Sequence, residues 1–153
     1  MPEVFLERRP AEAIRKFVAV FVGFWASDRV LLRRLRALGV LRPGLYRSLR
    51  ERDSWRREGA KTLIHRIRSA TRLQMDEDAT VDLLTSLTSF ETFDSISADD
   101  KSPDEVALFL TSAILLFFGL RGDRRSSNPV RQLPKAVAPS HSPRAGPRRQ
   151  AGP

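Results

Sequence analysis

The stretch SPDEVALFLTSAILLFFGL, residues 102–120, decides the fold because it is a helix with a recognisable start, a recognisable end and almost no polar face. Ser102, Pro103 and Glu105 combine a capping hydroxyl, a proline suited to the first helical position and a carboxylate that can reach back to the cap. Gly119 suits the position after the last turn. After Glu105 only Thr111 and Ser112 interrupt the apolar residues, so the helix is apolar on nearly every side. A chain of this size covers one side of such a helix, and we expect a second chain to cover the other.

A membrane span is a poor explanation for this stretch. At about 1.5 Å per residue, the uncharged run 106–120 is shorter than the roughly 30 Å hydrocarbon core of a bilayer. The first residues, MPEVFLERRP, contain acidic side chains and no unbroken apolar segment, unlike a secretory signal. We therefore predict a cytoplasmic protein with no membrane partner.

The net charge of +9 is unevenly distributed along the 153 residues. Residues 1–75 carry a net charge of +11, residues 76–110 of −9, and residues 111–153 of +7. A uniformly basic nucleic-acid binder would not show this pattern, although local basic faces remain possible.

Helical periodicity extends over most of the chain before residue 102. Apolar residues recur at spacings of three and four in 11–26, with Asp28 or Ser27 as a cap for a second helix to about residue 38, where Gly39 ends it. A long helix follows over 44–71, and another begins with the acidic residues 76–78 and ends between 93 and 96. The prediction is an all-α domain of about five helices over residues 1–120.

The last part of the chain has a different composition. Residues 121–153 contain six prolines and few large apolar side chains. Such a segment cannot bury enough surface to offset the entropy of ordering, so we predict a disordered basic tail.

No set of residues has the arrangement of a catalytic or metal centre. The chain has no cysteine, which excludes disulfides and thiolate ligands. His65 has no cysteine or carboxylate three or four residues away, and we interpret it as a satisfied or solvent-facing side chain. Asp76, Glu77 and Asp78 resemble a helix N-terminus more than a metal site, because they lack the alternating ligands and glycine of a calcium loop. We expect no enzyme activity, no metal and no cofactor.

Two further sets of residues could bind a partner. Arginines could contact nucleic-acid phosphates, although a solvated charged surface is the more frequent explanation of such runs; they are Arg33, Arg34, Arg36, Arg42, Arg47, Arg50 and Arg57. Aromatic residues are numerous for helices of this length, and aromatic side chains line many apolar small-molecule pockets, although core packing is the commoner role of any one of them.

The order of these segments resembles the C-terminal domain of tetracycline-repressor-like (TetR-like) transcriptional regulators. The resemblance covers residues 10–120 and depends on an aromatic-rich helix ending in FW, then SDRVLLRRLRALG, a proline-glycine turn, LYRSLRERDSWRREGAKTLIHRI, LLTSLTSFETFDSI and SPDEVALFLTSAIL. It implies that the helices 79–93 and 103–119 pack with the same pair of a second subunit as a four-helix bundle. The interface candidates are Leu83, Leu87, Phe90, Leu108, Leu115 and Phe118.

The resemblance also implies a small, often apolar, effector bound between the earlier helices. The residues that could line its pocket are Phe17, Phe21, Trp25, Trp55, Ile64 and Phe93. Such regulators begin with a helix-turn-helix module of about 50 residues that reads DNA. We recognise no such module here, so we expect the true start to lie upstream or the protein to be a remnant of a regulator.

The sequence therefore predicts the effector-binding and homodimerisation part of a bacterial TetR-like regulator, which contacts DNA only through a missing N-terminal module. Two alternatives remain open. One is a stand-alone helical protein that forms heterodimers with a full-length regulator, and the other is a non-specific nucleic-acid binder.

Overall fold

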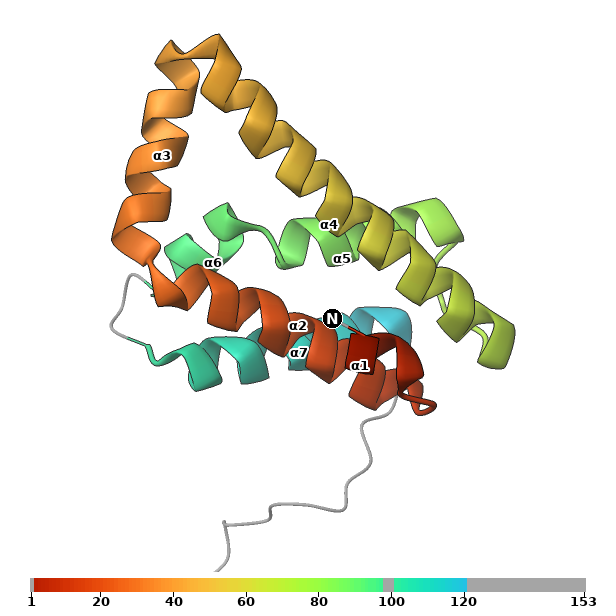
Figure 1. The fold of residues 1–153 in the computed structure, drawn as a ribbon. Helices are drawn as coiled ribbons and strands as arrows, with labels where there is room; N and C mark the ends of the chain where they lie inside the picture. Colours follow the sequence, from red (N-terminus) through yellow and green to blue (C-terminus); the bar gives the residue numbers. More distant parts are fainter. Residues whose placement is uncertain (1, 98–100, 121–153) are drawn as a thin grey trace, which may run out of the picture. The chain divides into compact units, whose positions relative to one another are not determined.

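The computed structural model describes residues 2–97 and 101–120, and in these residues it contains seven helices and no strand (Figure 1). The all-α prediction is confirmed for this part of the chain, whereas the count of about five helices is too low. The predicted tail, 121–153, lies outside the described residues. The helices are α1 (Pro2–Leu6), α2 (Pro10–Ser27), α3 (Arg29–Leu41), α4 (Pro43–Ala70), α5 (Glu77–Leu87), α6 (Phe90–Ile96) and α7 (Pro103–Phe118).

Helix α7 has both of the ends that its sequence predicts. Ser102 Oγ accepts a hydrogen bond from the Glu105 amide at 3.3 Å, and Glu105 Oε2 accepts one from the Ser102 amide at 2.8 Å. The Ser102 amide, and after it the Ser102 hydroxyl, donate to Glu105 Oε2 and hold the pKa of Glu105 below its usual range, because they favour the charged carboxylate. At the other end Gly119 has φ +69°, the left-handed conformation that closes a helix.

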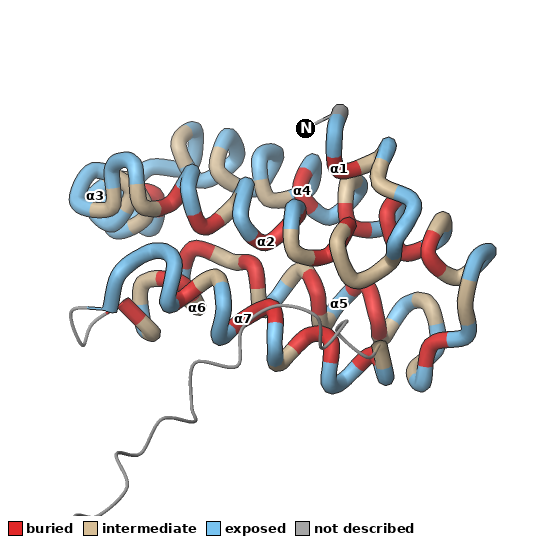
Figure 2. The backbone as a smooth tube through the Cα atoms, turned by 90° about the horizontal axis from the view of Figure 1, so that it is seen from below, coloured by how far each residue is buried: buried red, intermediate tan, exposed pale blue. Residues whose placement is uncertain are grey.

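Helix α7 lies alongside α2 and supplies one side of the core. Its inward residues recur every four positions, which places them on one face of the helix; they are Val106, Leu110, Ile114 and Phe118. Ile14, Phe17 and Val18 of α2 are buried in the same apolar cluster. Figure 2 shows buried segments along α2, α4, α5 and α7, whereas α3 is exposed over most of its length.

The predicted helix 79–93 is wrong in one respect, because two helices replace it. Helix α5 ends at Leu87 and α6 begins at Phe90. The Thr88 hydroxyl donates to the Leu84 carbonyl at 2.7 Å, and the Ser89 hydroxyl accepts from the Thr92 amide at 3.2 Å. These short polar side chains offer the backbone alternatives to a continuous helix. The Thr88 carbonyl accepts from Trp25 Nε1 at 3.0 Å, so the break leaves this buried oxygen satisfied.

Helices α3 and α4 form a hairpin at the predicted proline-glycine turn, but the first of these helices ends later than predicted. The expectation that Gly39 ends the second predicted helix is wrong, since α3 continues to Leu41. Gly39 is buried, and a Cβ placed there would lie 3.0 Å from Leu49 Cδ1 of α4. The glycine therefore permits close approach of the two helices. Pro43 starts α4, which occupies the predicted long segment to within one residue at each end.

The short helix α1 is absent from the sequence prediction; it packs against α2 and is joined to α4 by one arginine. The Arg66 guanidinium of α4 donates to the carbonyl oxygens of Val4, Phe5 and Glu7 at 3.1, 2.6 and 2.8 Å. Val4 is buried in the core. None of the described helices combines the length and the hydropathy needed to cross a membrane.

Candidate functional site

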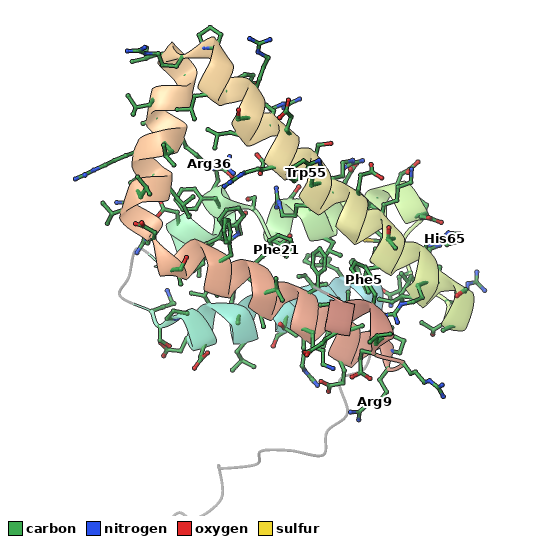
Figure 3. All side chains as sticks on the ribbon, viewed as in Figure 1. Phe5, Arg9, Phe21, Arg36, Trp55 and His65 are labelled. Atoms are coloured by element: carbon green, nitrogen blue, oxygen red, sulfur yellow. The ribbon has the colours of Figure 1, made fainter. Side chains whose placement is uncertain are left out.

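A cavity of about 410 Å³ lies between α2, α3 and α4. Its volume falls within the range of small-molecule sites, roughly 300–1,000 Å³. Figure 1 shows the three helices as the sides of a triangle, and Figure 3 shows Phe21 of α2 and Arg36 of α3 extending into the region that they border. The residues lining the cavity are Val20, Phe21, Phe24, Trp25, Leu32, Arg36, Leu49, Arg52, Asp53, Trp55 and Arg56.

The cavity exists because α4 changes its packing partner along its length. Its first half packs against α3, where Leu49 approaches Gly39. Its second half packs against α5, and the continuous series of buried residues begins only at Arg56 and Ala60. Between these contacts α4 has no buried apolar residue, and this part of the helix faces α2 across the cavity.

Aromatic side chains of α2 form much of the cavity wall. Phe21 and Trp25 have ring centroids 6.3 Å apart, and Phe24 meets Trp25 edge to face at 4.8 Å. Trp25 is held by its hydrogen bond to Thr88 and by an edge-to-face contact with Phe90 at 5.7 Å. The wall is therefore preformed on the α2 side, whereas Trp55 on the α4 side is 73% exposed and lies at the mouth.

The structure separates the six predicted pocket residues into two groups. Phe21, Trp25 and Trp55 line the cavity. Phe17, Ile64 and Phe93 do not line it; they are buried in the core. Phe17 contacts Phe21 with ring centroids 4.9 Å apart, so it supports the wall from behind.

A polar network borders the cavity where α3, α4 and α6 meet. Arg36 donates to both carboxylate oxygens of Asp53 at 3.2 and 3.0 Å and forms an ion pair with Glu91 at 2.8 Å. Arg56 donates to the Thr85 carbonyl at 2.6 Å and to Asp53 at 3.4 Å. Burial lowers the pKa of the Arg56 guanidinium, and the nearby Asp53 carboxylate opposes that shift.

Positive charge and hydrogen-bond donors are in excess along this side of the cavity. The Nε atoms of Arg36 and Arg56 are buried and have no hydrogen-bond acceptor among the described residues. Arg52 is exposed and lines the cavity, and within residues 2–97 and 101–120 it has no hydrogen-bond or ion-pair partner. The wall therefore carries a cation without a counter-charge.

Sequence reasoning missed most of the residues of α3 and α4 that line the cavity. A signal was present in the long helix, where the charged residues 50–53 and Ser54 interrupt the apolar pattern between Leu49 and Trp55. An interrupted apolar stripe marks a turn of helix that does not pack on the core. Here it marks the cavity, but only the position of α2 opposite that turn shows this.

The six predicted interface residues also lie in different environments. Leu83 and Leu87 are half-buried, and Phe90, Leu115 and Phe118 are buried by the chain itself, which leaves them little surface for a partner. Leu108 is exposed. Four exposed residues of α7 form what we term the outer face, namely Leu108, Phe109, Leu116 and Phe117.

Several arginines considered for nucleic-acid binding have intramolecular partners. Arg33 binds Asp94 at 2.7 Å, Arg36 binds Asp53 and Glu91, and Arg57 pairs with Asp82. Arg50 lies over the Tyr46 ring, with 6.0 Å between its Cζ and the ring centroid. The basic first half of the chain thus pairs in part with its acidic middle.

The remaining polar candidates have structural explanations. Asp76 caps α5 by accepting from the Ala79 amide at 2.8 Å, as its position predicts. His65 is exposed and its Nδ1 lies 3.4 Å from Glu77. Among the described residues, no group of three or more histidines or carboxylates could hold a metal ion.

Comparisons with protein-family models, curated proteins and solved structures find no match to this chain.

Proposed function

We propose that this chain is the effector-binding and dimerisation part of a TetR-like bacterial transcriptional regulator. The observation that carries the proposal is the aromatic cavity between α2, α3 and α4, to which three residues expected in an effector pocket contribute. We assign no contact with DNA bases to residues 2–97 or 101–120.

The cavity is placed where a ligand could alter helix packing. Helix α3 has one buried residue, Gly39, so its position depends on its hairpin packing with α4 and on ion pairs with α6 rather than on burial in the core. A molecule that fills the cavity would touch α2, α3 and α4 together. It would shift their arrangement only to the extent that it binds one arrangement more tightly than another.

The outer face of α7 supports the dimerisation half of the proposal. Its four large apolar residues are exposed in the single chain, and burial of each would contribute about 1.5–3 kcal/mol. The exposed residues of α5 are instead polar, including Asp78, Asp82 and Ser86. We therefore centre the contact between two copies on α7 rather than on both predicted bundle helices.

The two tryptophans provide a direct test of the cavity. Both tryptophans of the chain, Trp25 and Trp55, line it. N-phenylnaphthylamine, a neutral apolar dye, should bind saturably to the full chain and quench tryptophan emission through energy transfer. Val20→Phe, which narrows the cavity, should weaken binding at least about tenfold because overpacking displaces the ligand or strains the wall.

The matched control is Val30→Phe. Val30 is also an exposed valine, but it lies on α3 and does not line the cavity. This variant should bind the dye as the parent does. Absence of saturable binding, or equal affinity in both variants, would remove the support for an effector site.

A further inference from the structure

The cavity combines an apolar wall with one uncompensated positive charge. Of its four charged lining residues, Arg36, Arg52 and Arg56 are cationic and Asp53 is anionic. Glu91 supplies a second carboxylate to Arg36 from α6. Two cations are thus matched by two carboxylates, and Arg52 remains.

Arg52 has the properties of a side chain that binds an anionic ligand. An arginine remains charged at any physiological pH and presents several donors that suit a carboxylate. Arg52 lies on α4 three residues from Trp55, so its side chain and the exposed indole occupy neighbouring positions at the cavity mouth. The unpaired Nε–H groups of Arg36 and Arg56 indicate the same shortage of acceptors along this side of the cavity.

We infer that the cavity takes an amphipathic organic anion, with an apolar, ring-sized or short-chain body against Phe21, Phe24 and Trp25 and a single anionic group, such as a carboxylate, on Arg52. This inference deepens the proposed effector function and depends on it. An apolar neutral molecule would fill the same volume but leave Arg52 without a counter-charge.

A pair of dyes with the same rings tests the anionic group separately from the apolar body. Anilinonaphthalene sulfonate carries one sulfonate, and N-phenylnaphthylamine has the same skeleton without it. Binding that is weakened in Val20→Phe is assigned to the cavity. The full chain should bind the sulfonate dye more tightly than the neutral dye in low salt.

The decisive variant is Arg52→Gln, which removes the charge at an exposed position where the described residues supply no partner. Affinity for the sulfonate dye should fall about tenfold, since a hydrogen bond to a charged group is lost, while affinity for the neutral dye stays the same. Arg47→Gln is the matched control, because Arg47 is an exposed arginine of the same helix that does not line the cavity. It should alter neither affinity.

The outcomes distinguish the two proposals. If the neutral dye binds in the cavity but Arg52→Gln affects neither dye, or both equally, the anionic ligand class is overturned and the effector site stands. If neither dye shows binding that Val20→Phe weakens, both proposals fail together.

Discussion

Gly119 and Gly23 show how the same residue type has opposite effects on stability at two backbone conformations. Gly119 has φ +69° after α7, and an added Cβ would lie 2.8 Å from side-chain atoms of Gln74. Gly23 lies inside α2, with no atom within 4 Å of such a Cβ. One glycine therefore permits a left-handed turn, whereas the other only weakens a helix.

We expect Gly119→Ala to lower the free energy of unfolding by about 1 kcal/mol, because a side chain disfavours the left-handed conformation. Gly23→Ala should raise it by about 1 kcal/mol through better helix propensity. Urea unfolding followed by circular dichroism measures both changes. Shifts of the same sign in the two variants would contradict the assigned roles.

At the junction of α3 with α6, the carboxylate of Asp94 binds two arginines of α3. Asp94 accepts from Arg29 Nε at 2.6 Å and from Arg33 Nη2 at 2.7 Å, and Arg29 also donates to the Ser97 carbonyl at 3.0 Å. The pKa of Asp94 lies below its ordinary range, first because of the hydrogen bond from Arg33 and then because of Arg29. The charged carboxylate is thus favoured in the folded chain.

This shift predicts a pH dependence of stability. Because the folded pKa is lower than the unfolded one, the contribution is complete above the unfolded value of about 3.9 and is lost as the pH falls through the folded pKa. Asp94→Asn should cost about 1–2 kcal/mol at pH 7, and much less under acidic conditions. Urea unfolding across this pH range measures the difference.

The control for this junction is Glu51→Gln, an exposed carboxylate of α4 with no hydrogen-bond or ion-pair partner among the described residues. It should change stability little at either pH. An Asp94→Asn deficit that stayed constant down to acidic pH would show that the arginine contacts are not its source.

For the molecule as a whole, the outer face of α7 predicts self-association. Leu116 on this face is 77% exposed, and Leu41 at the end of α3 is 76% exposed. Leu116→Glu should convert a dimer to monomer, since a buried unpaired carboxylate costs several kcal/mol. Leu41→Glu, matched in residue type and exposure, should leave the dimer intact.

Sedimentation velocity on the full chain at micromolar concentrations separates these states. A monomeric parent protein would contradict the proposed dimer, and equal dissociation in both variants would place the contact elsewhere than on α7.

The cavity is only partly predictable from the sequence. Aromatic residues that recur along one helix indicate Phe21 and Trp25, and Trp55 stands out as an isolated aromatic residue in a charged segment. Phe17 belongs to the same periodic series as Phe21 yet lies in the core. Periodicity places residues on a face, but it does not say where a neighbouring helix departs from that face.

Helix identity and helix ends follow from residues a few positions apart. Ser102, Glu105 and Gly119 act on the backbone within one turn, so the sequence alone determines their roles. The core positions of α2 follow likewise from local spacing, whereas α7 is apolar on nearly every side and its spacing does not mark the buried face. By contrast, Asp94 meets Arg33 across 61 positions, and Leu49 meets Gly39 because two helices cross there. The paired charges, the unpaired Arg52 and the cavity depend on how separate helices pack in space, and no short-range pattern encodes that packing.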